Sequence, residues 1–178
     1  MQRRAIILGF GTLLFLVFFS GPALSQAVTG FADLRDKDDN IVANADFREI
    51  DEGILITLHA KDMPPGIHAI HIHAVGKCEA PDFAAAGGHF NPGNKKHGLK
   101  NSEGPHAGDL PNLYVTKSGA GRFQTIDDRI TLSSGVNTIF DGDGSALVIH
   151  AAGDDNVTDP SGSSGDRIAC GVIVKGTR

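Results

Sequence analysis

Turn residues divide the chain from residue 28 onward into eight short runs that are apolar or alternate between apolar and polar residues. Runs of this length, bounded by Gly, Pro, Asn and Asp, are typical of β-strands, and no segment has the period of a convincing helix. Many short strands joined by Gly-rich turns predict an all-β Greek-key barrel or sandwich of about eight antiparallel strands. The predicted strands span residues 28–34, 41–50, 53–60, 67–74, 113–116, 122–126, 146–150 and 168–174.

Two longer stretches interrupt this rhythm. Residues 76–109 have little periodicity and are dense in Gly, Asn, Pro and His, whereas residues 151–166 are rich in Asp, Ser and Gly. Insertions of this length without secondary structure are usually functional in a compact domain. No internal repeat or linker is visible, and the length is natural for one domain with one core. We therefore expect one β-domain that carries two long functional loops.

Residues 1–27 are distinct from this domain. Arg3 and Arg4 precede an apolar run over residues 5–19, and helix-breaking Gly21-Pro22 and small residues follow. This order is typical of a secretory signal peptide. A membrane anchor is the alternative, but about 15 apolar residues fall short of the roughly 20 that span a bilayer. We therefore expect export to the periplasm, or otherwise secretion, of a domain at residues 28–178 that is not membrane-bound.

The charge and the cysteines narrow the functional class further. Removal of the leader would take away two Arg and no acid, which moves the formal net charge from -5 to -7. An acidic domain without a basic cluster argues against nucleic acid as a partner. The two cysteines, Cys78 and Cys170, favour a disulfide in an exported chain, with two buried free thiols as the alternative.

Histidines are the candidate metal ligands. Residues 71–73 read His-Ile-His, and the strand period of two places both imidazoles on one face, where they can chelate one metal. His68 falls on the opposite face and is interpreted as a core histidine with a satisfied hydrogen bond. His59 lies in another predicted strand without a ligand partner. Both are therefore left out of the predicted site.

The first long loop supplies a second candidate set. Three imidazoles and one carboxylate form a tetrahedral N/O set suited to zinc. Their spacing is too wide for one helical turn, so the loop would have to wrap around the ion; a polar surface loop that happens to contain histidines is the alternative. His150, at the end of an apolar run, is placed to complete a site. The members of the loop set are His89, His97, His106 and Asp109.

The order of these motifs carries a resemblance to a known family. Together they resemble copper,zinc superoxide dismutases of the exported bacterial type across essentially the whole of residues 28–178. The segments are Gly66-Ile67-His68-Ala69-Ile70-His71-Ile72-His73, Gly88-His89-Phe90-Asn91-Pro92, Lys96-His97-Gly98, His106-Ala107-Gly108-Asp109-Leu110, Val148-Ile149-His150 and Gly165-Asp166-Arg167-Ile168-Ala169-Cys170-Gly171-Val172.

The resemblance implies a role for each candidate residue. Cys78 and Cys170 match the family's intrachain disulfide. Arg167 matches the arginine beside copper, which with the metal-bridging histidine is expected to be catalytic. Asp154 matches the carboxylate that links a copper histidine to a zinc histidine. One ligand is shared between the two implied metal sets: copper with His71, His73, His89 and His150, and zinc with His89, His97, His106 and Asp109.

The implied activity is the disproportionation of superoxide to dioxygen and hydrogen peroxide by a copper redox cycle, with zinc to fix and tune His89. The local positive charge of Arg167 would bind the anion. The charged residues that guide substrate in eukaryotic members have no clear counterparts here. A homodimer is compatible with the resemblance, but bacterial and eukaryotic branches use different interfaces, so the resemblance does not fix the oligomeric state.

Two alternatives remain beside this reading. A non-catalytic exported protein that buffers or delivers copper or zinc would use the same ligands. Such a metal store has no need of an anion-binding group like Arg167 beside the copper. A copper-only dismutase would lack the zinc ligands, which are present here as His97, His106 and Asp109.

Overall fold

The protein folds as an antiparallel β-structure. The structure is a computed structural model that describes residues 28–178, so the signal peptide expected at residues 1–27 lies outside the described residues. Within 28–178 no helix is long and apolar enough to cross a membrane. All eight predicted strands are present, two of them divided: β1 (Thr29–Arg35), β2 (Ile41–Ile50), β3 (Gly53–Ala60), β4 (Gly66–His68), β5 (Ile70–His73), β6 (Leu113–Val115), β7 (Gly121–Asp127), β8 (Ala146–His150), β9 (Arg167–Val172) and β10 (Val174–Lys175).

The sheet nearly closes on itself. Its strand order is β4-β6-β7-β3-β2-β1-β9-β8-β5, with β10 on β1. The two end strands, β4 and β5, are separated only by Ala69, where the chain changes its partner from β6 to β8. The Ala69 amide leaves the ladder and donates to the Ala152 carbonyl at 2.9 Å. The strand predicted over residues 67–74 is therefore two strands, and it joins both ends of the sheet into a barrel.

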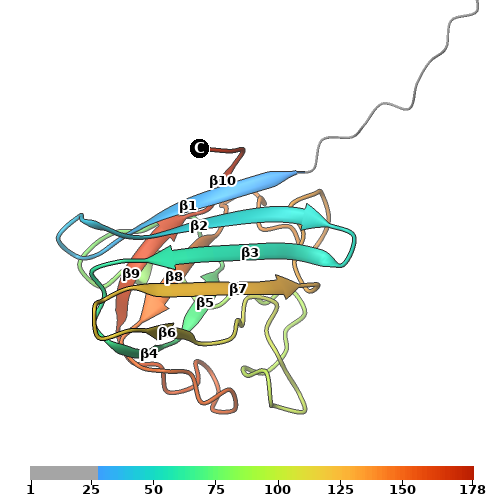
Figure 1. Ribbon diagram of the computed structural model, residues 1–178. Coiled ribbons are helices and arrows are strands. Elements are labelled where there is room, and N and C mark those ends of the chain that lie inside the picture. The colour runs from blue at the N-terminus through green and yellow to red at the C-terminus, as the bar shows by residue number, and fades with distance from the viewer. Residues whose placement is uncertain (1–27) are drawn as a thin grey trace, which may run out of the picture.

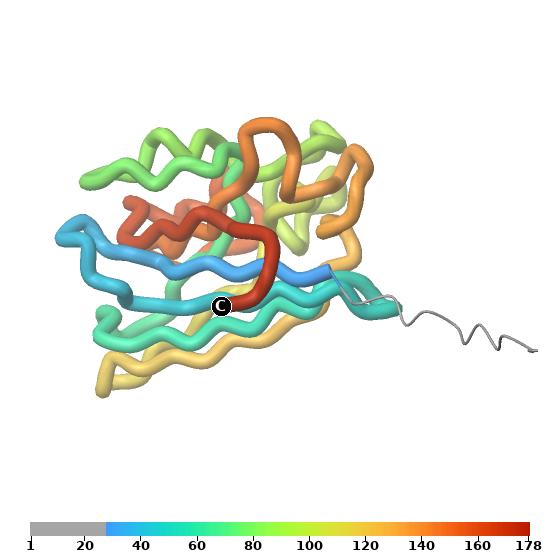
Figure 2. Tube along the Cα trace, turned by 90° about the horizontal axis from the view of Figure 1, so that it is seen from above, coloured from blue at the N-terminus to red at the C-terminus, as the bar shows by residue number. Residues whose placement is uncertain are grey.

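The barrel is flattened into two layers (Figure 1, Figure 2). Strands β1, β2, β3 and β7 form one layer, and β5, β8 and β9 form the other. The neighbours β3–β7 and β1–β9 are far apart in sequence, which is the long-range pairing of a Greek key. The predicted all-β Greek-key architecture is confirmed.

Alternation along the strands builds the core. In β3, Ile54, Ile56 and Leu58 are at most 1% exposed, and their neighbours in sequence face outward. In β5, by contrast, all four residues are buried. A strand in an antiparallel barrel has both faces buried only when other chain covers its outer side. Long connections provide that cover.

Three long connections leave the barrel. The predicted loops are observed as residues 74–112 and 151–166, and the yellow-green part of the first lies toward the same side as the orange-red second loop in Figure 1. A third connection, residues 128–145, was not singled out from the sequence. It buries Ile130, Leu132 and Ile139 in the main apolar cluster. This third loop therefore closes the core, and the other two remain available to form a site.

Candidate metal centre

The loop of residues 74–112 is fastened to β5 by its backbone. The Phe90 amide donates to the Ile72 carbonyl at 2.8 Å, and the Ile72 amide donates to Gly108 at 2.9 Å. Gly108 in turn donates to Phe90 at 2.8 Å. A Cβ at Gly108 would collide with the Ile72 carbonyl, so the close approach requires glycine. These bonds hold the loop against the outer face of β5, from which two histidines project.

All seven predicted ligands converge there. Six are buried and His89 is half-buried; the carboxylate of Asp109 is fully enclosed. The candidate ligand atoms of six of them form two groups in which every atom lies within 4.8 Å of the others, and the seventh, His106, approaches the second group through Asp109 and His89. The first group is His71, His73, His89 and His150, and the second contains His89, His97 and Asp109 together with His71.

Backbone carbonyls fix the tautomers in the first group. His73 Nδ1 lies 2.9 Å from the Gly87 carbonyl, and His150 Nδ1 lies 3.2 Å from the Gly165 carbonyl. A carbonyl only accepts, so each Nδ1 carries the proton and each Nε2 carries a lone pair. The two Nε2 atoms face each other at 3.4 Å. Two facing lone pairs in a buried site call for a cation between them.

A carboxylate orients two further rings. Asp154 accepts hydrogen bonds from His71 Nε2 at 2.8 Å and from His97 Nε2 at 3.0 Å. His71 Nδ1 is buried and has no hydrogen-bond partner among the described residues. A buried imidazole nitrogen rarely lacks a partner, and metal coordination satisfies it. We therefore assign His71 Nδ1 to the first group and leave His71 out of the second.

The second group has the dimensions of a tetrahedral ion site. Asp109 Oδ1 lies 2.9 Å from His89 Nδ1, 3.0 Å from His97 Nδ1 and 3.2 Å from His106 Nδ1. The Nδ1 atoms of His89 and His106 are 3.3 Å apart. Four ligands at about 2.0 Å from a zinc ion have edges of about 3.3 Å. The amides of Gly98 and His106 occupy the other oxygen, Oδ2, so that Oδ1 points inward.

Burial keeps the first group neutral. It lowers the pKa of His89 to about 4 and that of His150 to about 3, because desolvation opposes the charged ring. Burial likewise holds the pKa of His73 well below its usual value, with the neighbouring His89 as the next cause. Neutral imidazoles offer the lone pairs that copper or zinc requires.

The carboxylates impose the opposite effect on His97. Burial would lower its pKa, but hydrogen bonds to Asp109 and Asp154 outweigh burial and raise it to about 9. Burial also opposes ionisation of the two acids, yet the histidine hydrogen bonds hold the pKa of each carboxyl far below its usual range. The two carboxylates, Asp109 and Asp154, outnumber the one protonated ring, so the pocket has a net negative charge that attracts a cation. The donor sets fit copper in the first group and zinc in the second.

Several residues that support the ligands were not predicted from the sequence. Asn112 pairs with the backbone of Asp154 in both directions, at 2.8 Å each. Gly162, at φ 64°, leaves the space that the Asp154 carboxylate occupies, because a Cβ there would overlap Oδ1. Arg129 donates to the Asp109 carbonyl at 2.6 Å and forks onto Asp127. The Gly-rich composition of residues 151–166 was the one sequence feature that indicated close packing around Asp154.

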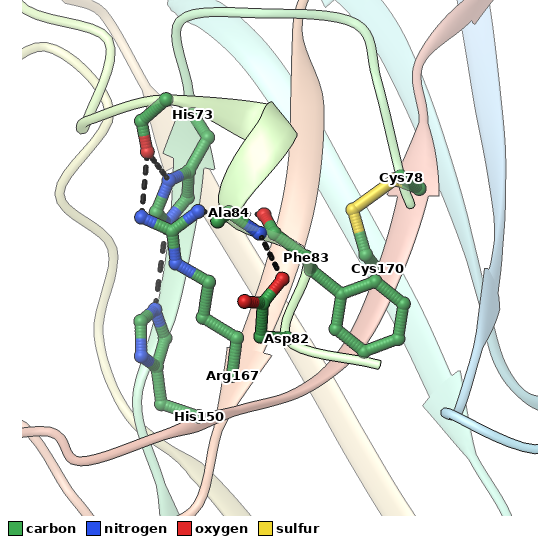
Figure 3. The surroundings of a disulfide bond; sticks show 9 residues. His73, Cys78, Asp82, Phe83, Ala84, His150, Arg167 and Cys170 are labelled. Carbon is green, nitrogen blue, oxygen red and sulfur yellow. Dashed lines mark hydrogen bonds between the residues drawn. A yellow bond between two sulfur atoms is a disulfide. The ribbon is translucent and has the colours of Figure 1, made fainter. Parts of the chain in front are cut away.

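Arg167 is held beside the first group by backbone carbonyls. Its Nη1 donates to Phe83 at 2.7 Å and its Nη2 donates to Gly87 at 2.6 Å. The Gly87 carbonyl also accepts His73 Nδ1–H, so one atom links the guanidinium to the histidine (Figure 3). Within residues 28–178 no carboxylate forms an ion pair with Arg167. The guanidinium therefore keeps its charge available.

The remaining cysteine and histidine predictions are settled by the fold. Cys78 and Cys170 form the expected disulfide, with Cα atoms 5.5 Å apart. His68 is 2% exposed, and its ring bonds to the His150 and Pro64 carbonyls at 2.8 Å each. It is thus a core histidine as predicted, whereas His59 is exposed on β3.

The comparisons with known proteins agree with this geometry. The family model for copper/zinc superoxide dismutase (SODC) matches residues 41–173. A Cu-Zn superoxide dismutase 2 of Aquifex aeolicus is 46% identical over 153 residues, which cover 85% of this chain and 90% of that protein. A Cu-Zn superoxide dismutase of Caulobacter vibrioides is 40% identical over 128 residues, covering 70% of this chain and 74% of that protein.

A solved structure shares the fold. The crystal structure of a double mutant of a SOD-like protein from Bacillus subtilis superposes with a TM-score of 0.78 and 43% identity, over 81% of this chain and 96% of that chain. The family match spans most of residues 28–178, and the relatives above are at least 40% identical. The chain therefore belongs to the copper/zinc superoxide dismutase family.

Proposed function

We propose that this protein is an exported enzyme that disproportionates superoxide to dioxygen and hydrogen peroxide. One observation carries the proposal: two buried donor groups share His89, and beside the first of them lies an arginine that pairs with no carboxylate among residues 28–178. A site that only stores metal has no need of that arginine. The family membership gives the proposal its reaction class.

The hydrogen bonds of each ring support a proposal for which of its nitrogens would bind a metal. For copper we propose Nδ1 of His71 and Nε2 of His73, His89 and His150. In His71, His73 and His150 the other ring nitrogen already has a hydrogen-bond partner, either Asp154 or a backbone carbonyl. For zinc we propose Asp109 Oδ1 and the three Nδ1 atoms that approach it, on His89, His97 and His106. His89 would then use both nitrogens. When bound, copper supplies one-electron redox chemistry and zinc supplies fixed charge without redox activity.

His89 is the proposed proton carrier. Its Nδ1 side faces Asp109, which leaves Nε2 as the nitrogen directed at the first group. Formation of hydrogen peroxide from the second superoxide consumes two protons, so a ring that holds a proton at Nε2 can deliver one of them.

Arg167 is the proposed anion-binding group. Two of its five N–H donors are used by carbonyls, so its orientation is fixed while donors remain for a small anion. A cavity of about 620 Å³ beside it is walled in part by aspartates, namely Asp36, Asp38, Asp62, Asp82 and Asp166. Lys37 also lines this cavity and none of the predicted metal ligands does, so its aspartates do not describe the surface at the first group, where the charge of Arg167 would attract the anion.

We propose a location for the protein from its expected signal peptide and its disulfide. A signal peptide at residues 1–27 would deliver the protein to the periplasm or outside the cell. The Cys78–Cys170 disulfide is compatible with such an oxidising compartment. Fractionation of cells that express the full chain tests this, since recovery of the uncleaved protein in the cytoplasm would contradict export.

The test of the function is one preparation of residues 28–178, assayed for bound copper and zinc and for superoxide consumption. We expect about one ion of each metal and a rate far above that of free copper. Near-stoichiometric metals without such activity would contradict the enzyme and support a copper or zinc buffer. Arg167→Ala separates the two functions further, because it should reduce the rate and leave both metals bound.

A further inference from the structure

The two carbonyls that hold Arg167 lie at the ends of one short 3₁₀ helix, η1 (Ala84–Ala86). Phe83 precedes this turn with φ 54° and ψ 25°, and Gly87 follows it with φ 73°. Both flanking residues thus have positive φ, and both carbonyls accept from the same guanidinium (Figure 3). Residues 83–87 therefore form a carbonyl arch whose shape depends on two unusual backbone conformations.

The two ends of the carbonyl arch differ in what maintains them. Glycine adopts positive φ without a steric penalty, so Gly87 needs no further support. For a bulky aromatic residue the left-handed region is an outlier that persists only when its surroundings enforce it. Backbone bonds contribute: the Phe83 amide donates to Glu79 at 3.0 Å, and the Ala86 amide donates to Phe83 at 3.1 Å. These bonds alone do not explain why phenylalanine occupies this position.

The ring of Phe83 supplies the additional support. It is 2% exposed and lies in the smaller apolar cluster, on the opposite side of the backbone from Arg167. That cluster includes Ala146 and Val148 of β8 and both cysteines of the disulfide, Cys78 and Cys170. The ring is thus packed against two strands of the barrel wall. It ties the carbonyl arch to β8, β9 and the disulfide.

We propose that Phe83 is a positioning residue for Arg167: its buried ring holds the left-handed backbone whose carbonyl fixes the guanidinium toward the anion site. The inference rests on the proposed role of Arg167 in binding the anion. An arginine fixed in advance loses little side-chain entropy when the anion binds, whereas a released one loses more.

A released guanidinium also has a competing partner. Asp82 lies next to Phe83 in the chain, and its charge raises the pKa of Arg167 against the lowering that burial causes. Its carboxylate now accepts the Ala84 amide at 3.0 Å (Figure 3). Loss of the Phe83 anchor would let the guanidinium turn from the carbonyls to this carboxylate. The Asp82 carboxylate would then neutralise the positive charge that binds the anion.

The experiment measures anion binding rather than turnover. Azide is titrated into copper- and zinc-loaded residues 28–178, and its dissociation constant is read from the Cu(II) absorption. Phe83→Leu and Phe83→Ala are compared with Phe47→Leu, a matched change at a ring that is 1% exposed in the other apolar cluster. Each Phe83 variant is also made in an Arg167→Ala background, to give a double-mutant cycle.

We expect Arg167→Ala to weaken azide binding by about tenfold, the effect of one charge-assisted hydrogen bond. Each Phe83 variant should weaken it by about threefold or more with both metals still bound, and by nothing further when Arg167 is alanine. Phe47→Leu should leave it unchanged. A purely structural role for Phe83 would instead give the same loss in both backgrounds.

Three results would overturn the inference. Unchanged azide affinity in a metal-loaded Phe83 variant would show that the ring does not position Arg167. Equal losses with and without Arg167 would show that Phe83 acts on the pocket by another route. Failure of both Phe83 variants to bind the metals would assign Phe83 to the metal sites instead. If Arg167→Ala alone leaves azide binding unchanged, the proposed role of Arg167 is itself wrong, and that single variant identifies this failure.

Discussion

Gly162→Ala tests whether the Asp154 carboxylate organises both metal groups. Gly162 has φ 64°, and an added Cβ would overlap Asp154 Oδ1 and come within 2.8 Å of His97 Nε2. The carboxylate cannot stay where it is, so it must give up the bond to His97 at 3.0 Å or the bond to His71 at 2.8 Å. Either loss frees an imidazole to rotate or to change its tautomer.

The expected magnitude has two parts. Alanine in the left-handed region costs about 1–2 kcal/mol of folding free energy, whatever its neighbours. Loss of a carboxylate that orients a metal-binding histidine costs about 10–100-fold in metal affinity. At about 1.4 kcal/mol for each factor of ten, that is about 1.4–2.8 kcal/mol of binding free energy. The second part is specific to the contact with Asp154.

Gly144→Ala separates the two parts. Gly144 has a similar φ of 69°, but the nearest heavy atom to its added Cβ is 3.6 Å away. Urea unfolding of the metal-free variants should show the backbone cost for both substitutions, with a further loss for Gly162→Ala from the displaced Asp154 carboxylate. Competition with a chromophoric chelator should show weakened metal binding for Gly162→Ala alone. If Gly162→Ala retains the copper and zinc affinities of Gly144→Ala, Asp154 does not organise the two groups.

Three further predictions concern the shared ligand, the proton balance and the disulfide. His89→Ala should reduce both copper and zinc content, and zinc at the wild-type level would contradict the bridging assignment. Zinc binding at pH 7 should release about one proton, because His97 has a pKa of about 9 without metal and must give up its Nδ1 proton. Calorimetry in buffers of different ionisation enthalpy measures the released proton. A binding enthalpy that does not depend on the buffer would contradict the prediction. Replacing Cys78 and Cys170 by serine removes a cross-link across 92 residues and should destabilise the protein by about 4–5 kcal/mol. Urea unfolding of the metal-free chain measures this loss, and a loss below about 1 kcal/mol would refute the prediction.

The strand pattern was predictable because it depends on local sequence. Apolar alternation and turn residues located all eight runs, including β3, whose Ile54, Ile56 and Leu58 face the core. The division at Ala69 was not predictable, since it depends on an exchange of partner strands and on a hydrogen bond from the Ala69 amide to the Ala152 carbonyl. The third loop was missed for a related reason: its buried Ile130 and Ile139 are isolated apolar residues whose burial depends on the closed barrel.

The identities of the ligands were visible in the sequence, but the atoms they present were not. His-Ile-His fixes two rings on one face, yet which nitrogen of His73 is free depends on the carbonyl of Gly87, fourteen residues away. For His71 it depends on Asp154, at a separation of 83 residues. Such partners are brought together only by loop closure, and no local period encodes them.

The same hydrogen bonds explain why one cluster of histidines can serve two metals differently. Carbonyl acceptors leave the ring of His73 neutral without adding charge, whereas carboxylate acceptors hold His97 between two anions. The first group is therefore nearly uncharged and suits an ion whose oxidation state changes by one electron. The second carries the negative charge of Asp109 and suits a permanent dication. His89 lies between the two groups, with one nitrogen directed at each. A change of charge at the first group therefore acts electrostatically on a ring that the second group holds in place.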